Sequence, residues 1–354
     1  MGTSRMSDVT RKIAGLVLRL AVTAALLYVV ARQVDFGQFH QAVHTTVWGF
    51  VFATWLLTAL FSLVQSIALR VVLRRQNCHV RLNTLFGASA ITALYSLILP
   101  GVLSTGIKWY VLKRDTGRGS QVFSSMVYNQ MTLFVTMTVI GLIAVLVRNP
   151  FPPGVSEQMD WVVPVVAAAL LVLIVLSSAL LLSPRTGRFV IRVFDWLLRP
   201  WPTTVRLKGH DVLEQIATFQ TAGARFHLKV AAINAFDAGV ICVLSYVAAA
   251  RAAGIRVPLG MFICLCASVY VLSKLPVTLA NLGFREVTLV GLLAGHGVSQ
   301  SAALLMSMIL FSSLIFMAAL GVVYQLVWGV HPQKPAGRSD VPSPVADPSH
   351  PGEG

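Results

Sequence analysis

Long uninterrupted apolar runs constrain this chain more than any other feature of its sequence. A segment needs about 20 apolar residues to cross a hydrocarbon core of about 30 Å as a helix. Runs of that length occupy residues 13–31, 47–69, 121–147, 161–183, 229–250 and 299–329. The sequence therefore predicts an all-α polytopic membrane protein with six full spans.

The composition fits a chain that has lipid as its solvent. Charged residues make up 12% of the chain, about half the share in a soluble domain. The 28 Lys and Arg exceed the 13 Asp and Glu by 15, which in a soluble chain would suggest nucleic acid. Here the cations lie between the apolar runs, where they orient the protein and contact anionic headgroups. We therefore expect membrane lipids as partners and no nucleic acid.

Two further apolar regions, 83–112 and 258–297, are interrupted near the middle. The interruptions read LPGVLSTGIKWY and LPVTLANLGFRE, and proline ends a helix because it lacks an amide donor. After the first break only about 18 Å of helix remains before the next cations, too short to cross. We therefore predict two re-entrant broken hairpins, and so eight membrane segments in all. The break residues are Pro100, Gly101 and Gly106, and Pro276 and Gly283.

The distribution of cations predicts the orientation. With the amino terminus inside and each hairpin returning to its own side, 20 Lys and Arg lie in the cytoplasm and four outside, as the positive-inside bias requires. One hairpin then enters from each face, as in an inverted repeat, which is a sequence pointer to a transport site near the midplane. The alternative is that both regions are ordinary kinked helices in a bundle.

The remaining segments flank or interrupt this membrane domain of residues 13–330. Residues 1–12 are expected to be a cytoplasmic amino terminus. Residues 184–228 are predicted to form a basic amphipathic segment at the cytoplasmic interface, with a solvated linker as the alternative. Residues 331–354 contain six prolines, which predicts a disordered cytoplasmic tail. The cations of the interfacial segment are Arg188, Arg192 and Arg199.

Six charged residues are expected at membrane depth, and all of them except Arg19 are candidate functional groups. Asp237 and Glu286 are carboxylates within apolar segments, where a charge costs about 2.5 to 3.5 kcal/mol. Pairing Asp237 with Lys108, Lys274 or Arg285 would leave a net positive pocket that suits a phosphate. A buried Asp237–Arg285 pair that only fixes helix packing is the alternative. Arg285 and Glu286 point about 100° apart on a helix, so we expect each to have a separate partner.

No catalytic signature accompanies these residues. The sequence has no glycine-rich phosphate loop, no HExxH and no GxSxG, and its four cysteines match no zinc or disulfide framework. We therefore expect no enzymatic activity, no metal and no cofactor.

The segment from Pro276 to Leu326 resembles the carboxy-terminal signature of the lysylphosphatidylglycerol synthase transmembrane-region family. In that family a proline-led break ends in Gly-x-Arg-Glu and is followed by an apolar helix, a Gly-Val-Ser step and a long span. The matching positions are Pro276, Gly283, Arg285, Glu286, Gly297, Val298, Ser299 and Ala302. Arg70, Pro100, Gly101, Tyr110, Leu112, Lys113 and Arg114 resemble the family's first broken segment.

One departure from the family pattern concerns that first break. The family usually has Gly-Gly-Asp or Gly-Gly-Glu followed by arginine, whereas this chain has Ser104, Thr105 and Gly106, with Lys108 as the nearby cation. An acidic group that would face the substrate is therefore missing. The resemblance implies a flippase-like membrane domain, which in bifunctional members moves a phospholipid modified by a fused aminoacyl-transfer domain. Because only a short tail follows residue 330, we do not expect aminoacylation by this chain.

The resemblance and the charged residues together predict a function. We expect a bacterial inner-membrane lipid translocase that moves a phosphate-containing lipid or lipid-linked glycan between leaflets. Arg285, with Lys108 or Lys274, would bind the phosphate, while Asp237 and Glu286 balance charge. One alternative is a membrane-embedded transferase acting on a lipid phosphate. Another is a non-transporting scaffold that recruits cytosolic lipid or glycan biosynthesis enzymes through 184–228.

Overall fold

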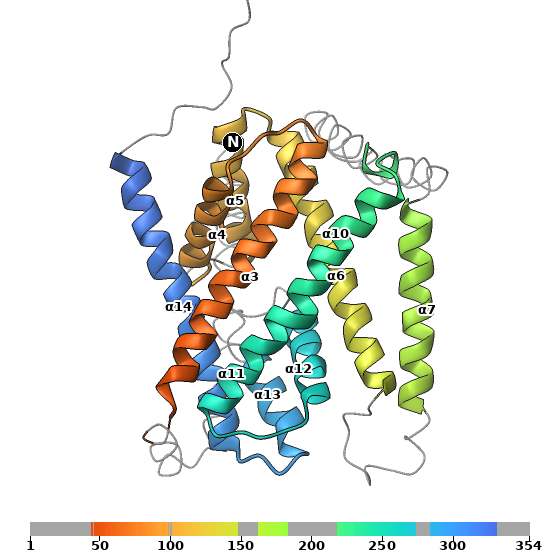
Figure 1. Cartoon of the computed structure of the whole chain (residues 1–354), viewed down its shortest axis with the longest axis vertical. Coiled ribbons are helices and arrows are strands. Elements are labelled where there is room, and N and C mark those ends of the chain that lie inside the picture. The colour runs from red at the N-terminus through yellow and green to blue at the C-terminus, as the bar shows by residue number, and fades with distance from the viewer. Residues whose placement is uncertain are drawn as a thin grey trace, which may run out of the picture.

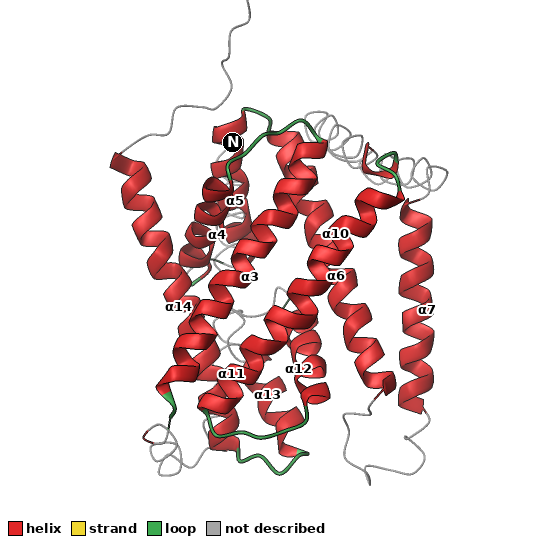
Figure 2. Cartoon of the chain, viewed as in Figure 1, coloured by secondary structure: helices red, strands yellow, loops and turns green. Residues whose placement is uncertain are grey.

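The computed structural model describes residues 46–97, 101–147, 162–182, 218–273 and 284–330, together with His44 and Leu99. Within these ranges every regular element is a helix (Figure 2), so the predicted all-α class is confirmed there. The helices are α3 (Trp48–Arg75), α4 (Leu82–Ser96), α5 (Gly101–Thr116), α6 (Gly119–Val147), α7 (Val162–Leu182), α10 (Ala224–Phe236), the π-helical η1 (Asp237–Cys242), α11 (Val243–Ala252), α12 (Leu259–Leu272), α13 (Phe284–Ala294) and α14 (Gln300–Val330).

Within the described ranges, four helical stretches are long and apolar enough to cross a membrane: α3, α6, the continuous α10–η1–α11, and α14. They coincide with the runs predicted at 47–69, 121–147, 229–250 and 299–329. Helix α7 occupies the predicted run 161–183, although its apolar stretch Val162–Ser177 is shorter. The first predicted run, 13–31, lies outside the described residues. The chain is a multi-pass membrane protein.

Helices α4 and α5 form a short antiparallel hairpin. Their 15 and 16 residues extend for only about 22 and 24 Å, against a hydrocarbon core of about 30 Å. Helix α4 begins near the end of α3, and α5 returns the chain to the same end of the bundle, where α6 begins (Figure 1). Helix α4 ends at Ser96 and α5 begins at Gly101, on either side of the segment where the break was predicted.

Gly106 does not belong to this break, so that part of the prediction was wrong. It lies in the interior of α5, and Gly101 is the first residue of the same helix. A single glycine weakens a helix by about 1 kcal/mol relative to alanine without ending it, whereas proline removes a hydrogen bond and disfavours helix in the residue before it. Both glycines therefore belong to helix α5.

Helices α12 and α13 occupy the opposite end of the bundle. They contain 14 and 11 residues, which correspond to about 21 and 17 Å. Helix α12 begins, and α13 ends, at the end of the bundle where α11 finishes and α14 begins (Figure 1). The residues that join the two helices, including Lys274, Pro276 and Gly283, lie outside the described part of the chain, as do Arg188, Arg192 and Arg199.

Helix α14 contacts elements from both ends of the bundle. The Trp55 indole of α3 donates to Ser312 Oγ at 2.8 Å and stacks on Phe316. Gly321 packs so closely on α4 that a Cβ there would collide with the backbone carbonyl of Ala90. Small residues at such contacts let membrane helices approach closely. Because α13 also packs on α14, this one helix joins both short hairpins.

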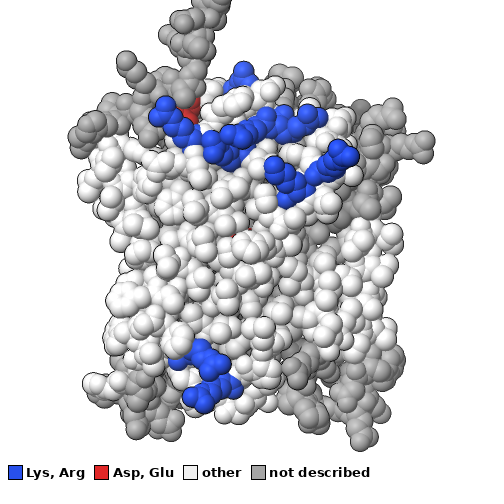
Figure 3. Space-filling model, in the orientation of Figure 1, with Lys and Arg blue, Asp and Glu red and all other residues white. Residues whose placement is uncertain are grey.

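The cations that the structure describes gather at the ends of the helices. Figure 3 shows a broad band of Lys and Arg at the end of the bundle where α3 finishes and a smaller group at the opposite end. Among the described residues, nine cations lie toward the first end and two, Arg251 and Arg256, at the second. The nine are Arg70, Arg74, Arg75, Arg81, Lys113, Arg114, Arg118, Arg225 and Lys229.

Candidate functional site

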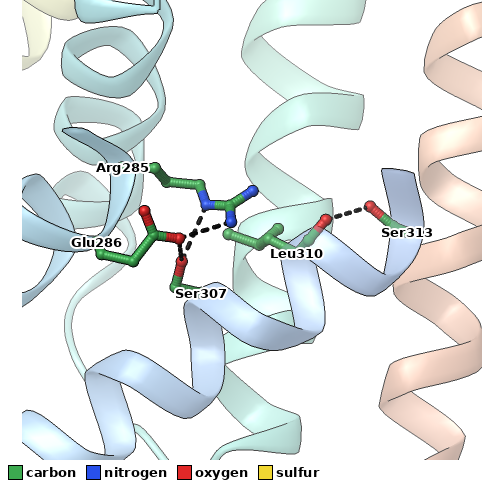
Figure 4. A network of polar contacts seen from close by, with 5 residues as sticks. All are labelled: Arg285, Glu286, Ser307, Leu310 and Ser313. Carbon is green, nitrogen blue, oxygen red and sulfur yellow. Dashed lines mark hydrogen bonds and ion pairs between the residues drawn. The ribbon is translucent and has the colours of Figure 1, made fainter. Parts of the chain in front are cut away.

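Arg285 and Glu286, in the first turn of α13, form a buried network with Ser307 of α14 (Figure 4). Arg285 Nη2 donates to Glu286 Oε1 at 2.7 Å, and Arg285 Nε donates to Ser307 Oγ at 2.9 Å. Ser307 Oγ in turn donates to the same carboxylate oxygen at 2.7 Å. The Arg285 and Glu286 side chains are only 11% and 4% exposed. The three groups form a closed triangle that links α13 to α14.

The expectation that Arg285 and Glu286 have separate partners was wrong. Their Cα–Cβ bonds diverge on the helix, but the long arginine side chain folds back toward the neighbouring carboxylate. Ser307 stabilises this arrangement because its hydroxyl accepts from one residue and donates to the other. Further along α14, Ser313 Oγ donates to the Leu310 carbonyl at 2.7 Å.

This pairing changes the charge expected around Arg285. Glu286 neutralises the guanidinium locally, so these residues do not create a net positive pocket by themselves. The guanidinium also lies over the Phe311 ring, with Cζ 5.6 Å from the ring centroid. Its Nη1 makes no hydrogen bond within the described part of the chain. One face of the arginine therefore retains donors for a further acceptor.

Asp237 lies in a second polar cluster, contributed by three spans. Gln65 of α3 donates from Nε2 to Asp237 Oδ2 at 2.6 Å and to Asn234 Oδ1 at 3.0 Å. Asn129 of α6 donates from Nδ2 to Gln65 Oε1 at 3.2 Å. Asp237 and Asn234 are fully buried and Asn129 is 8% exposed, while Gln65 is half-buried. Gln65 thus connects the other three side chains.

The expected pairing of Asp237 with a cation is not found within the described ranges. The ion pair present there joins Arg285 to Glu286, which also removes the alternative of an Asp237–Arg285 pair. Lys274, the third candidate, lies outside those ranges. Asp237 is bound by a neutral amide because Gln65 projects from the facing helix at the same depth.

Lys108, midway along α5, differs from the two buried networks. Its side chain is half-buried. Its ammonium makes no hydrogen bond or ion pair within the parts of the chain that the structure describes, and Asp115 near the end of the same helix is not joined to it. Lys108 therefore offers a positive charge that no described carboxylate neutralises.

Comparison with known families identifies the membrane domain. A family model described as the lysylphosphatidylglycerol synthase TM region matches residues 16–321. The chain belongs to the lysylphosphatidylglycerol synthase transmembrane-region family. None of the curated proteins compared with the chain matches it. The family match includes both buried networks and Lys108, so all three lie within the lysylphosphatidylglycerol synthase transmembrane region of this chain.

Sequence reasoning missed four uncharged members of these networks in the lysylphosphatidylglycerol synthase transmembrane region. They are Gln65, Asn129, Asn234 and Ser307. The prediction began from formal charge, which singled out the two carboxylates but not the amides and hydroxyl that accompany them. An available signal was a set of amide side chains within long apolar runs, since amides in membrane helices bond across helix interfaces.

Proposed function

We propose that this chain is a lipid translocase that moves a phosphate-containing lipid or lipid-linked glycan between the leaflets of a bacterial inner membrane. The observation that carries the proposal is a pair of short broken hairpins, α4–α5 and α12–α13, at opposite ends of one membrane bundle. Membership of the lysylphosphatidylglycerol synthase transmembrane-region family supports a role in the membrane.

The proposal treats both hairpins as re-entrant elements. Neither arm of either hairpin is long enough to cross the hydrocarbon core (Figure 1). We propose that the ends of these arms, Ser96 and Gly101 in the first hairpin and Leu272 and Phe284 in the second, lie inside the bilayer. Backbone groups at helix ends are tolerated there only if protein buries them or water reaches them. Opposed interrupted segments are typical of transporter sites near the midplane. A lipid headgroup would pass between these tips while the acyl or prenyl tails stay in the bilayer.

Within this path we assign the first phosphate contact to Lys108. Its ammonium has no described partner, so a phosphate would supply the missing counter-charge. Arg285 would contribute a second contact through Nη1, weakened by the neighbouring Glu286. Lys274 remains a third candidate. The proposal includes no chemical step on the lipid and no cofactor, and it leaves membrane lipids as the partners.

Replacing Lys108 tests this assignment. Lys108→Gln keeps a polar side chain, one atom shorter than lysine, and removes the charge. It should slow movement of a phosphate-containing lipid by about tenfold or more, because a hydrogen bond to a charged group contributes about 1.5 to 3 kcal/mol. The measurement uses proteoliposomes that contain a headgroup-labelled fluorescent phospholipid, with a membrane-impermeant quencher added outside.

The matched control for this experiment is Lys113→Gln on the same helix. Lys113 is exposed near the end of α5, where its ammonium lies 4.9 Å from the centroid of the Trp109 ring. This control should move lipid at the wild-type rate. If both variants move lipid at the same rate, Lys108 does not contact the lipid during its movement. If wild-type vesicles are no faster than protein-free vesicles, translocation itself is refuted.

The charge distribution also yields an orientation that can be measured. We propose that the cation-rich end is cytoplasmic, as the positive-inside bias requires (Figure 3). Thr221 precedes α10 at that end, whereas Ser299 precedes α14 at the other, and both are exposed. In a background with the four native cysteines changed to alanine, Ser299→Cys should react with an impermeant maleimide in intact spheroplasts. Thr221→Cys should react only after permeabilisation, and the reverse pattern would invert the topology.

A further inference from the structure

The polar cluster around Asp237 forms a layer between apolar layers of the membrane bundle. Along each of three spans, the polar residue is bordered by apolar cluster residues on the side toward the cation-rich end and on the side away from it. Read from the cation-rich end, the order on α3 is Val72, Gln65, Phe61. On α6 it is Tyr128, Asn129, Leu133. On α10 and η1 it is Val230, Asn234, Asp237, Ala238. Gln65 is the member of the layer with appreciable exposure.

Three buried atoms of this layer have no hydrogen-bond partner. They are Asp237 Oδ1, Asn129 Oδ1 and Asn234 Nδ2. All three residues are bonded to the same Gln65 amide group, so the unpaired atoms share one neighbourhood. Buried polar atoms are normally paired, and an exception in a native fold calls for a bound species or a functional role. The layer has two acceptors and one donor to satisfy.

This set of atoms suits a proton better than a metal ion. A metal cation would be repelled by the unpaired Asn234 amide and would find few free oxygens. A proton on Asp237 removes the buried charge and turns an acceptor into a donor. One water molecule that accepts from Asn234 could complete the bonds of the layer in either protonation state, because water has two donors and two acceptor sites.

The backbone at Asp237 adds an independent feature. The six residues Asp237–Cys242 form a π-helical turn within the 29-residue span Ala224–Ala252. Such turns are rare overall, and those that occur are often at functional sites. One extra residue per turn shifts the side chains that follow and loosens the local hydrogen bonding. Asp237 is the first residue of this turn. A change in the π turn would therefore reorient the carboxyl group directly.

The other titratable groups near the layer do not replace a proton as its counter-charge. On α3 the nearest is Arg70, which lies five residues beyond Gln65 and forms no described ion pair with Asp237. On α6 and α10, Tyr128 Oη and His227 Nδ1 are bonded to each other at 2.6 Å. The remaining groups are Cys242 on η1, Tyr246 on α11, and Tyr270 and Cys266 on α12.

We propose that Asp237 is a proton-binding site, whose carboxyl group binds and releases a proton as the bundle changes conformation. Gln65 stabilises the ionised form because its amide donates to the carboxylate. Proton binding at Asp237 stands independently of the proposed function. Coupling of that proton to lipid movement rests on the translocase proposal. In that case a proton gradient is the energy source for lipid movement.

Infrared difference spectroscopy of the whole protein in lipid vesicles tests proton binding directly. Between pH 5 and pH 9, the wild type should show the carbonyl band of a protonated carboxyl that disappears as pH rises. Asp237→Asn, which is nearly isosteric, should lack this band. Gln65→Leu removes the donor to the carboxylate. The pH at which the carbonyl band has lost half its intensity should therefore rise by about one unit, a tenfold change in proton affinity. Spectra of wild type and Asp237→Asn that match at every pH would overturn the proposal.

A pH gradient across proteoliposomes tests the coupling. A gradient of about one unit shifts an exchange of one proton by about tenfold, so wild-type lipid movement should depend on the gradient and movement by Asp237→Asn should not. Wild-type movement that ignores the gradient would overturn the coupling. Absence of any lipid movement by the wild type would refute the translocase function, whereas a titrating Asp237 band in the same sample would still support the proton site.

Discussion

Arg285→Ala should destabilise the protein strongly, by about 3 to 5 kcal/mol, because it leaves Glu286 buried without its cation. The Glu286 side chain is 4% exposed, and the neutral Ser307 hydroxyl cannot balance its charge. The change should lower both the midpoint of thermal unfolding in detergent and the yield of monodisperse protein. Arg251→Ala is the matched control, because Arg251 is an exposed arginine in the last turn of α11. Its unfolding midpoint should remain close to that of the wild type.

The double variant Arg285→Met with Glu286→Leu separates stability from function. Replacing both members of a buried pair by apolar residues is often neutral or stabilising, so the double variant should recover most of the lost stability. If its lipid movement also recovers, the pair has a structural role. If stability returns without movement, Arg285 contacts the lipid. If Arg285→Ala is as stable as the wild type, that result would contradict the geometry of the network.

The fold was predictable from sequence wherever one physical requirement determines the local structure. Uninterrupted apolar runs long enough to cross a bilayer predicted the long helices, because a helix pairs its backbone groups within the segment itself. Pro100 predicted the first break, since proline removes a donor whatever its surroundings. Gly106 misled because the effect of a glycine depends on context, and at this position a Cβ would meet nothing within 4 Å.

The candidate site was less predictable because partners depend on tertiary contacts. The buried carboxylates Asp237 and Glu286 were identified from sequence, since charge in an apolar run is rare. Their partners were not, because Gln65 is 172 residues from Asp237 and Ser307 is 21 residues from Glu286 along the chain. The choice of a neutral amide for one acid and an adjacent arginine for the other depends on helix rotation and depth.

Gly321→Ala should strongly weaken the contact between α14 and α4. A Cβ at this position would collide with the Ala90 carbonyl of α4, and a backbone atom cannot rotate away as a side chain does. The two helices must separate, so we expect the free energy of unfolding to fall by about 3 kcal/mol. Gly291→Ala on α13 is the matched control, because its Cβ would meet nothing within 4 Å. It should be neutral or stabilising by up to about 1 kcal/mol, since alanine favours helix more than glycine does.

Helix α14 forms hydrogen bonds with helices of both hairpins. Tyr324 and Gln325 of α14 bond to Asn83 and Tyr95 of α4, while Ser307 of the same helix bonds to Arg285 and Glu286 of α13. Helix α14 therefore connects the two hairpins, and displacing it at Gly321 should also change their relative placement. Lipid movement should then fall in Gly321→Ala even below its unfolding temperature, and remain normal in Gly291→Ala. Normal movement in both variants would mean that the α4–α14 contact serves stability alone.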